Sequence, residues 1–174
     1  GMRMSQLDDS NFLMQSAIKA GHSLDESAMA FLYSTGKVEL VLRNLLAAEL
    51  VKTLELDRDE QIEREWKRHD LVLLKGKKAT HIIEGKAWLH ADVTHPTKLD
   101  RGGAEIKVAF EKDLLKIRNT QLEHPEAIGY ITIILSSIDV SNCGKQLAKL
   151  VSYLNLHKRG IKDAGDFENL HSTA

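Results

Sequence analysis

The chain has 174 residues, of which 43% are hydrophobic and 28% charged, and its formal net charge is −1 at pH 7. This composition is typical of one compact soluble domain and excludes collagen-like or largely disordered chains. Because the charge is balanced, no global basic field is available for nucleic acid or acidic membranes, and an anionic substrate needs local binding. No apolar run approaches the ~20 residues of a membrane helix, and the polar start lacks a signal peptide, so we expect a cytoplasmic protein.

The N-terminal part of the chain is predicted to be helical. Cap-type residues at 9–11 precede apolar residues at helical spacing, which predicts a short helix that ends near Gly21. A second helix follows Ser23 and ends before Gly36. Residues 38–54 carry the clearest helical period and predict an amphipathic helix of four or more turns.

A β-hairpin is predicted after this helix. The charged stretch 55–65 is interpreted as helix end, loop and approach to the first strand. Residues 71–74 are aliphatic, 75–78 form a turn-like cluster, and 80–88 are extended in character.

The second half of the chain alternates between loop, helix and strand signals. Residues 90–103 are polar and contain Pro96 and two glycines, which favours a surface loop. Residues 105–119 return to helical spacing, and 127–137 are typical of a buried strand. A last helix is predicted around 147–154, before a polar tail. The order indicates an α/β fold with a mixed sheet covered by helices.

Three charged side chains are expected to converge on the hairpin. Asp70 opens the first strand, and Glu84, Gly85 and Lys86 follow one another on the second. Because strand side chains alternate between faces, Glu84 and Lys86 point the same way, and the Gly85 carbonyl is able to face a ligand. Burying such charges beside aliphatic residues is costly unless a metal or mutual pairing compensates. Two carboxylates and a carbonyl suit Mg²⁺ or Mn²⁺.

At these residues the chain resembles the PD-(D/E)XK nuclease superfamily, which has the restriction-endonuclease-like fold. The resemblance rests on Asp70 in HDLVLL, Glu84-Gly85-Lys86 in HIIEGKAW and Glu39 in VELVLRNLL, and it spans about residues 36–137. It implies a core order of helix, strands, helix, strand, here with an N-terminal helical extension at 9–35 and a C-terminal helix and tail at 141–174. Residues 61–68 are a candidate for a further strand of that core.

The resemblance also implies an activity and a set of roles. Asp70, Glu84, the Gly85 backbone carbonyl and Glu39 would hold or support Mg²⁺ (or Mn²⁺), and Lys86 would position or activate the attacking water. The protein would then be a metal-dependent nuclease, with DNA as the expected substrate. Because cutting both strands of a duplex needs two sites, a homodimer is a further expectation.

The register of the hairpin tests whether Asp70 and Glu84 can meet. An odd-numbered loop places Asp70 opposite Glu84, whereas a two-residue loop at Gly76 and Lys77 pairs Asp70 with Ile83. A bulge restores the alignment. A shared site therefore predicts either an odd loop or a bulge.

Each of these residues also has a purely structural interpretation. Asp70 and Glu84 can be strand-end charges with Lys86 paired across the hairpin, and Glu39 can form a helical pair with Arg43, with Glu49 as the competing acid. The lysines of the turn and of the later helix are either solvated or contact phosphates. His90, Asp92 and His95 are either loop residues or zinc ligands. Trp66 and Trp88 either pack in the protein or stack on bases. Cys143 is interpreted as a structural thiol.

Three hypotheses follow. The first is the metal-dependent nuclease. The second is a catalytically silent member of the same fold that binds nucleic acid or protein. The third is an unrelated α/β domain in which the motif is a coincidence, and it is favoured if Asp70 and Glu84 lie on opposite sides of the sheet.

Overall fold

The computed structural model describes residues 1–25, 28–29, 31–32, 38–89 and 99–136. The chain divides into two compact units, the first formed by Gly1–Ser23, Leu42–Lys86 and Lys107–Ile134 and the second by Leu24–Val41, Ala87–Ile106 and Leu135–Ala174. Much of the second unit lies outside the described residues, so a single domain over 1–174 stays a prediction.

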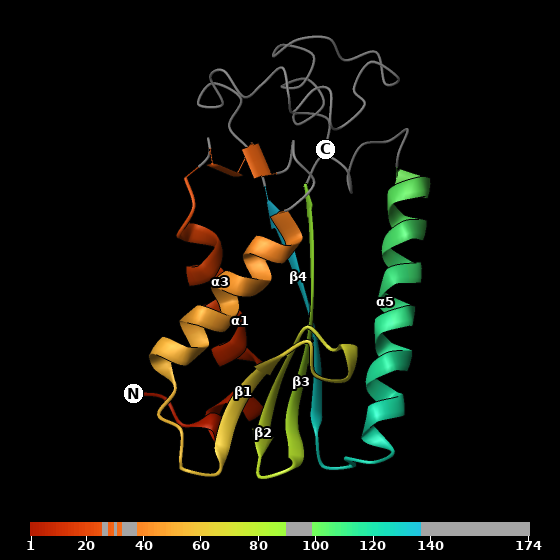
Figure 1. Cartoon of the computed structure of the whole chain (residues 1–174). Helices are drawn as coiled ribbons and strands as arrows, with labels where there is room; N and C mark the ends of the chain where they lie inside the picture. The colour runs from red at the N-terminus through yellow and green to blue at the C-terminus, as the bar shows by residue number, and fades with distance from the viewer. Residues whose placement is uncertain (26–27, 30, 33–37, 90–98, 137–174) are drawn as a thin grey trace. The chain divides into compact units, whose positions relative to one another are not determined.

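A four-stranded mixed sheet in the order β1-β2-β3-β4 forms the centre of the first unit. Strands β1 (Glu60–Arg64), β2 (Leu71–Lys75) and β3 (Lys78–Leu89) are antiparallel neighbours. Helix α5 (Leu99–Gln121) carries the chain back along the sheet, so β4 (Ile128–Ser136) runs beside β3 in the same direction (Figure 1). The α/β class with a mixed sheet and flanking helices is therefore confirmed.

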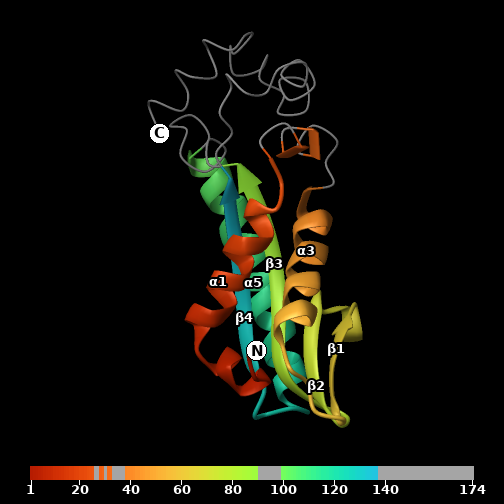
Figure 2. The ribbon, with the colours of Figure 1, turned by 90° about the vertical axis from the view of Figure 1, so that its left-hand side faces the viewer.

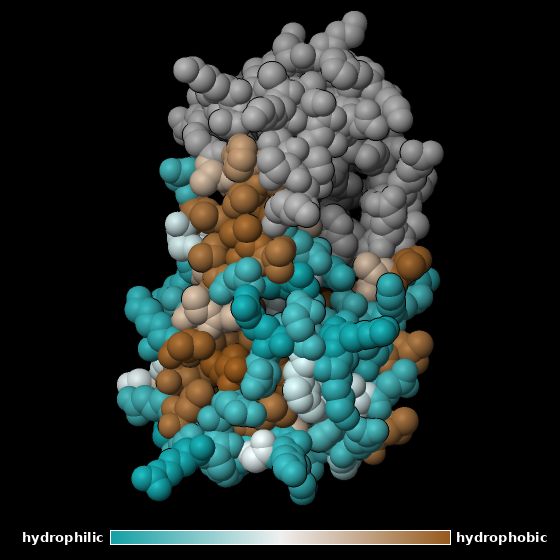
Figure 3. All heavy atoms as spheres, in the orientation of Figure 1, coloured by the Kyte–Doolittle hydropathy of each residue, from teal (hydrophilic) through white to brown (hydrophobic). Residues whose placement is uncertain are grey.

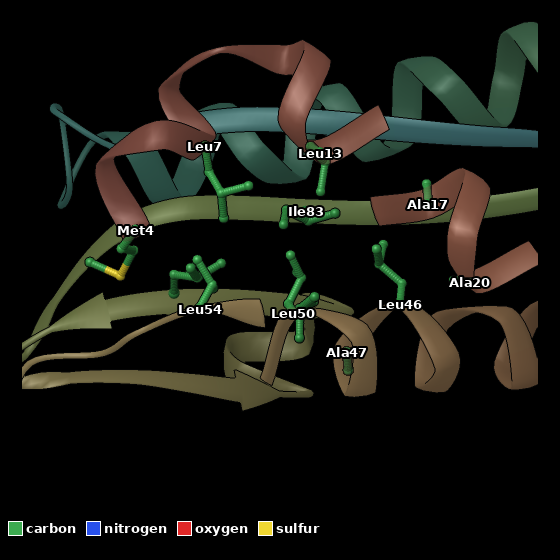
Figure 4. Packing of buried hydrophobic residues seen from close by; sticks show 12 residues of the cluster. Met4, Leu7, Leu13, Ala17, Ala20, Leu46, Ala47, Leu50, Leu54 and Ile83 are labelled. Carbon is green, nitrogen blue, oxygen red and sulfur yellow. The ribbon is translucent and has the colours of Figure 1, made fainter. Parts of the chain in front are cut away.

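One face of the sheet is covered by the N-terminal helices. Helix α1 (Ser10–His22) begins after Asp9, whose carboxylate accepts a hydrogen bond from the Asn11 amide at 2.9 Å, as expected for a helix cap. Helix α3 (Val38–Thr53) packs beside it (Figure 2). Figure 4 shows their apolar side chains meeting over Ile83 of β3, in a cluster whose members include Leu7, Leu13, Leu46, Leu50 and Leu54.

Helix α5 covers the opposite face. Val72 and Leu74 of β2 and Ile82 of β3 pack there against Ile117 of α5, whereas Leu71 and Leu73 belong to the α1 and α3 side. This alternation explains the LVLL sequence of β2, since a strand that is buried on both faces needs apolar side chains at every position. All four of these residues are at most 3% exposed.

The hairpin uses the two-residue turn together with a bulge. Lys75 pairs with Lys78 and Leu74 with Ala79, but the register shifts between Leu73 and Leu74, so that Leu73 pairs with His81. Thr80 is the extra residue. Leu71 consequently pairs with Ile83, and the ladder continues towards Asp70 opposite Glu84. The bulge required by the shared-site hypothesis is confirmed.

Two expected boundaries were wrong. Residues 60–64 form strand β1, which overlaps the candidate strand at 61–68, so the interpretation of the whole stretch 55–65 as helix end, loop and approach was wrong. The side chains of β1 lack apolar alternation because it is a largely exposed edge strand. Helix α5 begins at Leu99 rather than 105, so the expected loop 90–103 ends within a helix that includes Gly102 and Gly103.

Other expectations concern residues outside the description. These are the break near Gly36, the loop residues 90–98, the last helix at 147–154 and the polar tail. Among the described residues, no helix combines the length and the apolar character needed to cross a membrane.

The turn of the hairpin provides a stability test. Gly76 has φ +61°, and a Cβ added there would meet no atom within 4 Å, so the only cost of a side chain is backbone strain. We expect Gly76→Ala to lower the free energy of unfolding by about 1 kcal/mol. Gly76→Asn, which tolerates the left-handed region, should lose clearly less in urea unfolding; equal losses would contradict a backbone origin.

Candidate functional site

Glu84 lies on β3 with its carboxylate turned towards α5. The side chain is 1% exposed, and each oxygen has its own partner. Oε1 lies 2.5 Å from Nδ1 of His69, and Oε2 lies 3.0 Å from Nζ of Lys116. The two donors compensate the cost of burying this carboxylate.

His69 connects this carboxylate to α5. The imidazole is fully buried, with Nε2 2.6 Å from the hydroxyl of Thr120. An ionised Glu84 only accepts hydrogen bonds, so Nδ1 must carry the proton that it donates. With that tautomer, Nε2 accepts a hydrogen bond from the Thr120 hydroxyl. We call His69, Glu84, Lys116 and Thr120 the Glu84 cluster.

Asp70 is held by different partners. Its Oδ2 accepts a hydrogen bond from the Gly85 amide at 2.7 Å, and its Oδ1 pairs with Nη1 of Arg43 on α3. A Cβ at position 85 would approach Cγ of Arg43 to 3.1 Å. Glycine at position 85 therefore lets Arg43 reach Asp70 across the strand.

Lys86 does not pair with Asp70 or Glu84 among the contacts described. Its Nζ lies 3.5 Å from Oδ2 of Asp113 on α5. Asp113 is 4% exposed, and Oδ2 accepts no hydrogen bond from the described residues. Lys86 thus has a partner on the helix, and its pairing across the hairpin stays a prediction.

The hairpin brings the backbones of Asp70 and Glu84 close together, but their carboxylates contact different helices. Glu84 and Lys86 face the α5 layer, as the strand alternation predicted. Oδ2 of Asp70 contacts the Gly85 amide of the neighbouring strand, but Oδ1 is turned towards Arg43 on the α3 layer. The backbone places the two acids opposite each other, while their partners come from opposite layers.

The donor set fits a hard divalent cation by type. Mg²⁺ prefers carboxylate and carbonyl oxygens, and each carboxylate oxygen has a second lone pair beyond the bond it makes here. However, three carboxylates (Asp70, Glu84 and Asp113) already face three cations (Arg43, Lys86 and Lys116). Within the described residues, no three histidine, cysteine, aspartate or glutamate side chains are grouped so as to hold a metal. A bound divalent cation would therefore compete with these lysine and arginine side chains for the carboxylates.

The other predicted residues lie elsewhere. Glu39 is in the first turn of α3 and belongs to the second unit, so its role stays a prediction. Oε1 of Glu49, the competing acid, lies 4.0 Å from Nζ of Lys19 on α1. Lys75 and Lys78 line a cavity of about 470 Å³ together with His81.

The aromatic and loop candidates have simpler outcomes. Trp66 packs at the edge of the α5-side core and meets the His124 ring edge-on, with ring centroids 5.4 Å apart, which confirms its packing role. The side chain of Trp88 and the residues His90, Asp92, His95 and Cys143 lie outside the description.

Sequence reasoning missed the α5 residues that contact Glu84, Lys86 and His69. Asp113, Lys116 and Thr120 are three and four residues apart, so they occupy one face of the helix. This spacing was readable as a polar stripe beside the apolar face. That it faces β3, and that His69 completes the cluster, depended on packing that the sequence pattern does not specify.

Comparison with known proteins adds no relative. No model of a protein family matches the chain, and neither a curated protein nor a solved structure was found to be similar.

Proposed function

We propose that the protein is a metal-dependent nuclease that hydrolyses phosphodiester bonds, with DNA as its substrate. The observation that carries this proposal is the bulged β2–β3 ladder. It brings Asp70 to the Gly85 amide, between Glu84 and Lys86, so that the acid of one strand meets the Glu-x-Lys segment of the next. The resemblance to the PD-(D/E)XK superfamily implies this arrangement.

The roles follow from the side chains at this point. Asp70, Glu84 and the Gly85 carbonyl would hold Mg²⁺ or Mn²⁺. The bound ion would supply charge for the scissile phosphate and acidify a water. Lys86 would orient that water and stabilise negative charge that develops on the phosphate oxygens.

The charge balance of the resting site supports a role for substrate. Lys116 and Arg43 form ion pairs with Glu84 and Asp70. A phosphodiester is negatively charged. Lys116 and Arg43 could therefore pair with the phosphate while Glu84 and Asp70 bind the metal. We therefore expect metal and nucleic acid to bind better together than separately.

A second candidate is a catalytically silent binding protein of the same fold. It is favoured by one observation, namely that every carboxylate oxygen of Asp70 and Glu84 already contacts a donor from this chain. An ion-paired site of this kind has no need of a metal. Under this hypothesis the Glu84 cluster has a structural role only.

The test is a cleavage assay with a matched variant. The purified chain is incubated with circular duplex DNA, single-stranded DNA and RNA, each with Mg²⁺, Mn²⁺ or EDTA. Lys86→Ala is compared with Lys52→Ala, which removes an exposed lysine of α3. We expect metal-dependent cutting that Lys52→Ala retains and Lys86→Ala loses by on the order of 100-fold or more.

Each alternative outcome is informative. Equal cutting by the wild type and Lys86→Ala would assign the activity to another site or to a contaminant. If no nucleic acid is cut, and calorimetry detects no Mn²⁺ binding, the nuclease proposal is wrong. Nucleic-acid binding without cutting would then favour the silent binding protein.

A further inference from the structure

Helix α5 carries an apolar stripe on its outer side that no described residue covers. Val108, Leu115 and Leu122 are 64%, 61% and 83% exposed. Their spacing of seven residues places them in a single line along the helix axis and the turn that ends it. Figure 3 shows hydrophobic residues recurring at intervals along the edge that α5 forms, among hydrophilic ones.

This stripe is distinct from the face that holds the helix on the sheet. Asp113 and Ile117 are buried on that inner face, at 4% and 3% exposure. Single exposed apolar residues are ordinary on protein surfaces, but three in register on one helix are typical of a surface that packs against another helix.

The residues that flank the stripe indicate what it packs against. Glu111 and Arg118 each lie three residues after a stripe residue, so they share one edge; Lys112 and Asn119 share the other. Glu111 is 61% exposed and lies 4.0 Å from Lys107, a weak solvent-exposed pair. Arg118 is exposed and makes no ion pair with any residue that the structure describes.

The charges on these edges are complementary when two copies of α5 pack antiparallel. Leu115 lies midway along the stripe, so two antiparallel copies place it opposite itself and Val108 opposite Leu122. A two-fold axis brings like edges together, which sets Glu111 beside Arg118 of the second copy, twice. On the other edge Lys112 meets Asn119, so no like charges face each other. A parallel arrangement would bring unlike edges together and place Glu111 beside Lys112 of the second copy, so exchanging the charges of Glu111 and Arg118 distinguishes the two arrangements.

We propose that the outer face of α5 binds a second copy of this chain, as an antiparallel homodimer with Leu115 on the two-fold axis. The contact has three apolar residues per copy and two symmetric ion pairs, so it is a small interface of moderate affinity. It lies on the side of α5 opposite Asp113. Association therefore leaves the Glu84 cluster of each copy uncovered, and the inference does not depend on the proposed activity.

The test is sedimentation equilibrium of the full chain from low to high micromolar concentration. Leu115→Glu places two carboxylates on the axis and should weaken dimerisation by on the order of 100-fold. Val51→Glu is the matched control, because Val51 is an apolar residue of α3 with the same 64% exposure as Val108. It should leave the dimer unchanged.

A charge exchange tests the antiparallel register. Glu111→Arg and Arg118→Glu should each weaken the dimer, and the double variant should restore it, because both ion pairs re-form with reversed sign. A wild type that stays monomeric at high micromolar concentration would overturn the proposal. A dimer that survives Leu115→Glu, or a double variant no better than the single ones, would overturn it as well.

Discussion

Replacing His69 by alanine is expected to lower the free energy of unfolding by about 3 kcal/mol. His69 is fully buried and lies 2.5 Å from Oε1 of Glu84, so its loss leaves a cavity and removes one of the two donors to a buried carboxylate. The hydroxyl of Thr120 loses its partner at the same time. Lys116 still holds Oε2 of Glu84, which keeps the expected loss near the lower end for a broken buried pair.

The measurement is urea unfolding of the variant beside two controls. His22→Ala removes an exposed histidine of α1 and should change stability by less than about 0.5 kcal/mol. His69→Asn keeps an amide donor near the position of Nδ1 and should recover part of the loss. If His69→Ala costs no more than His22→Ala, the Glu84 cluster does not form as described.

Glu84→Gln is expected to abolish metal binding and cleavage while leaving a folded protein. The substitution keeps the shape of the side chain but removes the charge that a divalent cation needs. Loss of a residue that only orients a ligand commonly costs 10- to 100-fold, so loss of a proposed ligand should exceed about 100-fold. Lys116 then faces a neutral group and is freed, which adds to the disruption of the site.

Two readouts separate binding from catalysis. Calorimetry with Mn²⁺ measures binding without any turnover, and the cleavage assay measures rate. Glu63→Gln, on the exposed side of β1, is the matched control and should behave as the wild type in both. Mn²⁺ affinity that is unchanged in Glu84→Gln would remove Glu84 from the ligand set, even if cleavage were lost through a change in structure.

The hairpin shows where sequence reasoning reached its limit. The alternation of β3 predicted that Glu84 and Lys86 share a side, and both do face α5. Whether Asp70 meets Glu84 depended on one residue of register. The sequence offered an odd loop or a bulge, and the structure has a two-residue turn with a bulge at Thr80. Residues 75–80 are compatible both with an odd-numbered loop and with a two-residue turn followed by a bulge. The pairing of β2 with β3 decided for the second.

The ion-pair partners of the charged residues were even harder to predict from the sequence. Arg43 was considered as a helical partner of Glu39, because neighbours four residues apart are visible in a sequence. In the structure it reaches Asp70, which is 27 residues away and on another element. Lys86 pairs with Asp113, and Glu84 with His69 and Lys116, all contacts that arise only after α5 packs on the sheet.

The sequence by itself determined the α/β class, the amphipathic helices α1 and α3, the hairpin and the strand β4, since these depend on local period and on apolar content. It also determined which residues carry ionisable groups at the hairpin. For β1, which has no apolar alternation, the sequence offered only a candidate strand at 61–68, and the tertiary structure decided its bounds and its place at the edge of the sheet. Only the tertiary structure decided the charge partners of Asp70, Glu84 and Lys86. Ion pairs between distant elements leave no periodic trace, because their geometry is fixed by how the layers pack rather than by neighbouring residues.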